Sequence, residues 1–226
     1  MARATTTRRP RPRQASVLPP PPHPPRGAEL TAEKLLQATH ELLCETAGAE
    51  PSVSQICARA DVRVAMVSYC FGGKAQLLDA LVDRAVGGIM AEQDALMGRG
   101  LAPEEALAVQ VEATVRNLVR YPYLNALSSR LAAGDHSVAR LSETFVRPTL
   151  AFYRRLVDEG VARGTLRPVD PTLLLFSVVG MCDFLFVARG WLADTGQALD
   201  DALVERFAEH TVQLVLRGVS PTPSGG

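Results

Sequence analysis

Between Leu30 and about Arg217, apolar residues recur at the three- and four-residue spacing of an α-helix, and this pattern limits the possible folds more than any other feature. Glycine and proline in this stretch fall mostly between the periodic segments, where they end helices. The one long apolar stretch, Leu173 to Leu192, contains Asp183 and Arg189, which argue against a membrane span. We therefore predict an all-α fold with no membrane contact.

The first 28 residues have a different composition from the rest of the chain. They contain six arginines, no acidic residue and eight of the sixteen prolines, which is typical of a disordered segment. The remaining residues carry 18 basic side chains against 24 acidic ones. Proline, not an apolar stretch, follows the arginines, so we expect no secretory signal. The four cysteines lack disulfide or zinc spacing, and we expect a cytoplasmic protein.

The pattern predicts four helices before residue 98 and five after it. Ser52 and Gln55 have the spacing of a capping box for the second helix. The first four are expected from a Thr31 cap to Gly48, from Ser52 to Ala60, from about Val64 to Cys70, and from Lys74 to about Met97. The later breaks are expected at Pro103, Pro122, Gly134, residues 164–171 and Gly196, with the last helix ending at Gly218.

The second and third predicted helices are short and joined by a tight turn, which is the arrangement of a helix-turn-helix. This part of the chain contains Ile56-Cys57, Ala60-Asp61-Val62-Arg63, Tyr69-Cys70-Phe71-Gly72-Gly73-Lys74 and Leu77-Leu78. On these residues the sequence resembles the DNA-binding domain of the TetR/AcrR-like family of bacterial transcriptional regulators, over roughly residues 30 to 84. Asp61 stands where the family has a turn glycine, and Arg63 where it has a Ser or Thr cap.

The resemblance implies four regions: a disordered arm at 1–28, a DNA-binding domain at 29–84, a ligand-binding and dimerisation domain at 85–217, and a disordered tail at 218–226. It implies that residues 63–69 face the major groove of double-stranded operator DNA. Residues 30–84 hold five basic and seven acidic residues and so lack a broad basic face, but residues 62–78 contain Arg63 and Lys74 and no acid, and the six arginines of the arm could add phosphate or minor-groove contacts. Few side chains of the recognition helix can hydrogen-bond to base edges, so we expect DNA binding to depend strongly on salt and on DNA shape. The expected DNA-contacting residues are Ser52, Arg63, Val64, Ala65, Met66, Ser68, Tyr69 and Lys74.

In the family, the later helices bind a small molecule and the last two form a four-helix bundle with a second copy. Leu173 to Leu192 and Leu199 to Leu216 suit this homodimer, and we expect an uncharged or amphipathic effector. Asp183 suits a partner such as an arginine or a helix end across the dimer, or a ligand contact. The candidate pocket residues, which also suit a plain core, are Met90, Leu107, Val111, Val115, Leu118, Phe152, Met181, Asp183 and Phe184.

Several other features bear on function. Gly87-Gly88 lies inside a long predicted helix and suits either a hinge or close helix packing. His40 and His210 have polar neighbours and are expected to face solvent or cap helices. Several polar residues lie around an expected helix break and could either line the mouth of a pocket or cap helices: Asn125, Ser128, Ser129, Arg130 and His136.

The sequence carries no enzyme motif, and we expect no catalytic residue, metal or cofactor. We predict a ligand-responsive transcriptional repressor. Two alternatives stay open: a helical adaptor that binds a partner through the proline-rich arm, and a regulator that senses oxidants through Cys57 and Cys70.

Overall fold

The computed structural model describes residues 26–46, 49–131 and 139–221, with side chains undescribed at Arg26 and at residues 128–131. Most of the predicted arm and tail, Gly48, Gly134 and His136 lie outside these ranges. The described residues form helices and connecting turns without a strand, so the all-α prediction is confirmed. None of the described helices is long and apolar enough to cross a membrane.

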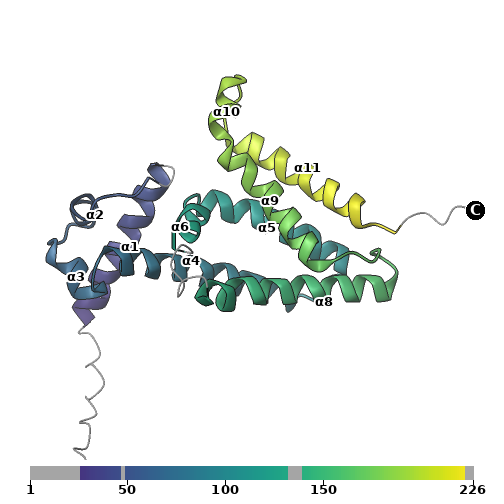
Figure 1. Ribbon diagram of the computed structural model, residues 1–226, viewed down its shortest axis with the longest axis horizontal. Helices are drawn as coiled ribbons and strands as arrows, with labels where there is room; N and C mark the ends of the chain where they lie inside the picture. Colours follow the sequence, from purple (N-terminus) through teal and green to yellow (C-terminus); the bar gives the residue numbers. More distant parts are fainter. Residues whose placement is uncertain (1–25, 47–48, 132–138, 222–226) are drawn as a thin grey trace, which may run out of the picture.

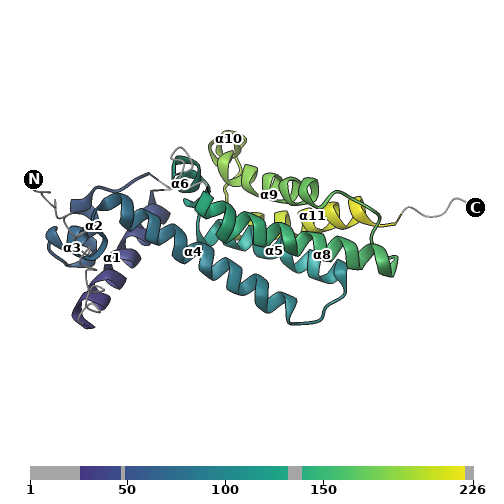
Figure 2. The ribbon, with the colours of Figure 1, turned by 60° about the horizontal axis from the view of Figure 1, so that its bottom comes forward.

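The chain forms a smaller group of helices at one end and a larger bundle at the other (Figures 1 and 2). Helices α1 to α3 make the smaller group, and α5, α8, α9 and α11 make the bundle. Helix α4 extends from the first group into the second. The helices are α1 (Arg26–Glu45), α2 (Val53–Ala60), α3 (Ala65–Phe71), α4 (Lys74–Met97), α5 (Pro103–Arg120), α6 (Leu124–Leu131), η1 (Ser142–Val146), α8 (Arg147–Arg163), α9 (Pro171–Val187), α10 (Arg189–Asp194) and α11 (Asp201–Val219).

Local sequence signals set the turn between α2 and α3. The Ser52 hydroxyl accepts from the Gln55 amide while the Gln55 side chain accepts from the Ser52 amide, which confirms the capping box. Asp61 ends α2 in the left-handed conformation at φ 52°, which Asp tolerates better than most residues. Helix α3 begins without a side-chain cap, as expected from Arg63, and ends at Gly72 with φ 86°.

Two predicted helix limits are wrong. Helix α1 begins at Arg26, and the Thr31 hydroxyl donates to the Gly27 carbonyl within the helix, 2.8 Å away, so Thr31 is not its N-cap. The apolar stretch to Leu192 is not one helix, because α9 ends at Val187 and α10 begins after Ala188. A continuous apolar sequence indicates that a segment is buried, but it does not indicate where the helix ends and the backbone turns.

Three buried apolar clusters hold the helices together. Leu35, Ile56 and Val67 are the centre of the first, which joins α1, α2 and α3. The second joins α1, α4 and α6 around Leu43 and Val82. The third is the core of the bundle. Because the second cluster includes both α1 and α6, it connects the small group of helices to the rest of the molecule.

Candidate functional site

One face of α3 is exposed, although the helix is short and packs on α1 and α4. Val64 is 55% exposed and Tyr69 is 65% exposed, and Ala65 and Ser68 lie on the same exposed side. Val67 is buried on the opposite side. Apolar and aromatic side chains on a free helix face suit contact with another molecule better than contact with water.

Charged and polar residues flank this face. Arg63 is exposed and forms no ion pair with any described residue. Lys74, at the start of α4, lies with its Nζ 2.7 Å from Glu50 Oε1. Ser52 is exposed at the start of α2. Of the eight predicted DNA-contacting residues, Met66 fits the expectation of an exposed contact least well, because its side chain is partly buried against the first apolar cluster.

A second candidate region is a cavity of about 650 Å³ in the larger part of the molecule. Its volume lies in the range of about 300–1,000 Å³ that is usual for small-molecule sites. Helices α4, α5, α6, α8 and α9 line it, together with η1, a π-helical turn that contributes Ser142, Phe145 and Val146. Such π-helical turns often occur at functional sites.

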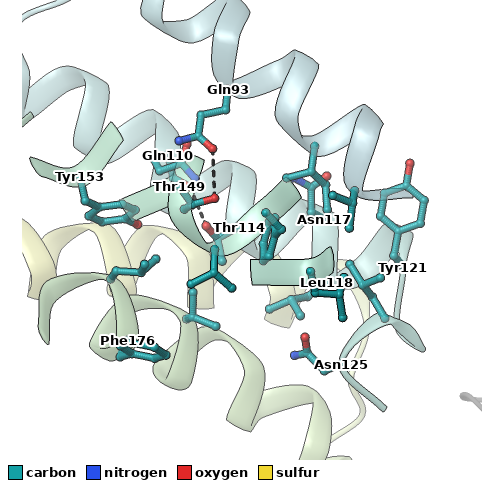
Figure 3. A pocket seen from close by; sticks show the side chains of 18 of the residues that line it. Gln93, Gln110, Thr114, Asn117, Leu118, Tyr121, Asn125, Thr149, Tyr153 and Phe176 are labelled. Carbon is teal, nitrogen blue, oxygen red and sulfur yellow. Dashed lines mark hydrogen bonds between the residues drawn. The ribbon is translucent and has the colours of Figure 1, made fainter. Parts of the chain in front are cut away.

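One wall of the cavity is polar (Figure 3). Gln93 of α4, Gln110 and Thr114 of α5 and Thr149 of α8 lie close together there. The Thr149 hydroxyl is 3.4 Å from Gln93 Oε1, and the Thr114 hydroxyl donates to the Gln110 carbonyl at 2.9 Å. These bonds satisfy part of the wall within the protein.

Two further polar atoms in the lining have no hydrogen-bond partner among the described residues: Asn117 Oδ1 and the Tyr153 hydroxyl. Both side chains are buried. Burial raises the pKa of the Tyr153 phenol, so the group stays protonated and can donate a hydrogen bond.

The rest of the lining is mainly apolar. Helix α9 contributes Leu175, Phe176 and Val179, and α4 contributes Val86 and Ile89. Among the described residues that line the cavity, none is an acid, a lysine or an arginine. The site thus pairs an apolar surface with a few neutral polar groups.

The structure places the predicted pocket residues in several different regions. Leu118 lines the cavity. Leu107, Val111, Val115 and Phe152 belong to the bundle core, and Met181 packs against that core. Their apolar side chains occupy the space between helices, which a periodic sequence pattern does not distinguish from a cavity wall.

The remaining predicted pocket residues are Met90, Asp183 and Phe184. Met90 packs against the cluster that joins α1, α4 and α6. Asn125, which lines the cavity, donates from its side-chain amide to Asp183 Oδ1, so the described partner of Asp183 is this amide. Phe184 is exposed and lies edge-on to Trp191.

Of the lining residues, the sequence analysis named only Leu118 and, as a possible pocket-mouth residue, Asn125, so it missed the polar wall together with most of the apolar lining. Gln110, Thr114 and Asn117 lie at positions i, i+4 and i+7 of α5, and therefore on one face of that helix. A polar stripe at this spacing inside a helix that must be buried is the signal that points to them.

His40 was expected to face solvent or to cap a helix; instead its ring is partly buried and contacts two tyrosines. Its Nδ1 lies 2.7 Å from the Tyr123 hydroxyl, and its ring lies edge-on to both Tyr121 and Tyr123. Burial lowers the pKa of His40. Tyr121 also lines the large cavity, so this aromatic group connects the cavity with α1.

The described cysteines do not have the environment of reactive thiols. Cys57 is buried and Cys70 is partly buried, and burial raises the pKa of each. A raised pKa reduces the fraction of reactive thiolate. No group of three or more His, Cys, Asp or Glu side chains suited to a metal ion occurs among the described residues.

Comparison with known proteins gives one family match. A family profile described as "Tetracyclin repressor-like, C-terminal domain" matches residues 100–225 of this chain. That span is more than half of the 226 residues. No curated protein matches the chain.

Solved structures share the fold. A transcriptional regulator of the TetR/AcrR family from Thermobifida fusca has 20% identity and a TM-score of 0.65, over 83% of this chain and 97% of that chain. The ketosteroid transcriptional regulator of Mycobacterium tuberculosis has 15% identity and a TM-score of 0.66, over 84% and 95%. AibR, solved in complex with isovaleryl coenzyme A and operator DNA, has 20% identity and a TM-score of 0.64, over 81% and 97%.

Proposed function

Because this chain belongs to the TetR family, we propose that it is a transcriptional repressor that binds operator DNA through α3 and leaves it when a small, largely apolar molecule occupies the cavity. The N-terminal unit up to about residue 84 would bind DNA, and the helices from there to about residue 217 would bind the effector and a second copy of the chain.

The observation that carries this proposal is the exposed face of α3. A short helix with Val64, Ala65, Ser68 and Tyr69 on one free side has the size and the exposure that a major-groove reading helix needs. One side of α3 packs on α1 and α4, and in this proposal the other side contacts DNA.

The chemistry of this face limits how it reads DNA. Arg63, Ser68 and Tyr69 can hydrogen-bond to base edges or phosphates, whereas Val64 and Ala65 can only contact thymine methyl groups. Lys74 can reach a phosphate if it leaves Glu50. With few donors, specificity also depends on the shape and flexibility of the DNA.

Helix α4 is suited to connect the two functions. Its first turns pack against α1 and α3, and further along it contributes Val86, Ile89 and Gln93 to the cavity. An effector that alters the position of α4 would therefore alter the position of α3. Coupling of this kind is typically worth about 1–3 kcal/mol.

A homodimer explains the apolar surface of the last helices. Leu173, Phe176, Phe184, Val187 and Trp191 are each between 57% and 69% exposed on α9 and α10. Monomeric proteins rarely leave such a surface in water. A second copy packed against it would form a two-fold symmetric dimer, and two α3 helices would then read two half-sites.

Selection from a pool of random DNA duplexes tests the proposal. We expect the purified chain to enrich one sequence made of two inverted half-sites. Tyr69→Ala should lose this selectivity, and Lys74→Ala should weaken binding to all sequences alike, with both variants remaining folded by circular dichroism. If no sequence is enriched by the folded wild-type protein, the proposed function is wrong, and the adaptor alternative gains support.

A further inference from the structure

A second, smaller recess adjoins the polar wall of the cavity. It has a volume of about 290 Å³ and lies between α4 and α5, which are joined by residues 98–102. The large cavity and this recess share four lining residues, Ile89, Gln93, Gln110 and Asn117. Three of these four carry side-chain amides, and the same wall is seen from the cavity in Figure 3. The amides therefore lie where the two hollows meet.

Two of these side chains have amide groups that are free to bind a ligand. The Gln110 amide forms no hydrogen bond with a described residue, and its atoms, unlike Asn117 Oδ1, are not completely buried. Gln93 uses its Oε1 with Thr149, and its NH₂ group is unpaired and accessible in the same way. Amides can donate and accept, so these side chains suit the polar part of a molecule that passes between the hollows.

The described lining of the recess is positively charged. Arg99, just after α4, and Arg116 of α5 line it, and both are exposed. Neither forms an ion pair with a described residue. Glu92 also lines the recess, and its carboxylate pairs with Arg120. The two guanidinium groups beside this neutralised carboxylate favour an anionic group, such as a phosphate or a carboxylate.

The two hollows thus differ in chemistry and suit the two ends of one amphiphile. A hydrocarbon chain in the large cavity would be removed from water against apolar side chains, which favours binding in proportion to the area buried. An anionic end in the recess would remain beside exposed arginines. It would therefore avoid the cost of burying an unpaired ion.

We infer that the effector is an amphiphile whose hydrocarbon chain occupies the large cavity and whose anionic end, a phosphate or a carboxylate, lies in the recess beside Arg99 and Arg116. The polar link between the two ends passes Gln93 and Gln110. This inference rests on the proposed function, because it names the class of molecule that the repressor responds to.

Two probes with the same ten-carbon chain test the inference: 1,10-decanediol and its monophosphate, 10-hydroxydecyl phosphate. Calorimetric titration of the full chain at pH 7 and low ionic strength should show that the monophosphate binds at least about tenfold more tightly than the diol. This is the effect expected of one charge-assisted hydrogen bond.

Variants separate the contributions of the recess, the wall and the cavity. The double variant Arg99→Gln, Arg116→Gln should bind the two probes with affinities within about threefold of each other, because both charges are removed. Gln110→Leu should weaken monophosphate binding by about fivefold, the effect of one neutral hydrogen bond. Val179→Phe places extra bulk in the cavity from α9 and should weaken binding of both probes.

Two controls distinguish recognition from a structural role. Arg154→Gln removes an exposed arginine of α8 that lies outside both hollows, and it should bind both probes like the wild type. The ligand-free double arginine variant should unfold at the wild-type temperature, because neither arginine forms an ion pair with a described residue. A lower unfolding temperature would indicate that these arginines have a structural role instead.

Three results would overturn the inference: equal binding of diol and monophosphate to the wild type, binding of neither probe, or a tenfold preference for the monophosphate that persists in the double arginine variant. These measurements use no DNA. The proposed function is tested separately by DNA selection without ligand, so either can fail while the other holds.

Discussion

At the scale of single residues, His40 is the ionisable group most closely tied to the contact between the two parts of the molecule. It lies on α1, and it bonds to Tyr123, which is fully buried next to the start of α6. Burial lowers its pKa below the ordinary value of 6.5, and this effect outweighs the nearby charge of Glu41. The imidazole is therefore neutral in the folded protein at pH 7.

This environment predicts acid sensitivity. A histidine with a lowered folded-state pKa binds its proton more readily when the chain is unfolded, so its contribution to stability is lost as pH falls below about 6.5. We expect His40→Gln to lose less stability than the wild type between pH 7 and pH 5, measured by urea unfolding.

The exposed His210 provides the matched control for this prediction. His210→Gln should retain the pH dependence of the wild type. If His40→Gln and the wild type lose stability equally between pH 7 and pH 5, the assignment of His40 as a partly buried residue with a lowered pKa is wrong.

Which residues could be predicted from sequence depends on how local their interactions are. The capping role of Ser52 and the left-handed turn at Asp61 involve only neighbours three residues away or fewer, and both predictions are confirmed. The bond between His40 and Tyr123 joins residues 83 positions apart. Neither residue has a sequence signal for the other, so this contact required the fold.

At the scale of elements, α4 joins the cavity to the proposed DNA-binding unit as one unbroken helix that contains Gly87 and Gly88. A Cβ atom added at Gly87 would meet nothing within 4 Å, and one added at Gly88 would lie 3.5 Å from the Tyr121 hydroxyl. Close packing therefore does not require glycine at residue 87. We propose that the backbone freedom of these glycines lets α4 act as a hinge.

The hinge proposal predicts opposite effects on stability and on regulation. Gly87→Ala should stabilise the protein by about 1 kcal/mol, because alanine favours the helix and the new methyl group has open space. The same variant, and more strongly the double variant with Gly88→Ala, should need a higher effector concentration to leave its DNA. Fluorescence anisotropy of labelled DNA, followed while 1,10-decanediol is added as an apolar probe of the cavity, measures this release. Unchanged release in the double variant would contradict the hinge.

Elements were predicted well where glycine, proline or a cap marks their ends. Lys74 to Met97 is found with the predicted limits because Gly73 precedes it and Gly98 follows it. The break at Ala188 has no such marker in the sequence. Most residues that line the cavity were not predicted from the sequence. They come from six helical segments, and the relative positions of these segments depend on tertiary packing.

At the scale of the whole molecule, charge and apolar surface are separated. The exposed apolar face of α9 and α10 belongs to the large bundle, whereas Arg63 and Lys74 belong to the small group of helices at the other end (Figure 1). Residues 30–84 are not basic overall. If the chain binds DNA as proposed, its affinity would come from a few well-placed contacts in each subunit, from the six arginines within residues 1–28, and from the proposed dimer, which doubles both.

The most direct test of the account is an anisotropy titration of the selected DNA at about 50 and 200 mM salt. Binding should weaken by at least about tenfold at the higher salt, because cations displaced from phosphates are released on binding. Arg63→Ala should weaken binding and reduce the salt slope by about one, while Arg154→Ala, on the distant α8, should match the wild type. Salt-independent affinity, or an Arg63→Ala variant that binds like the wild type, would contradict DNA recognition by α3.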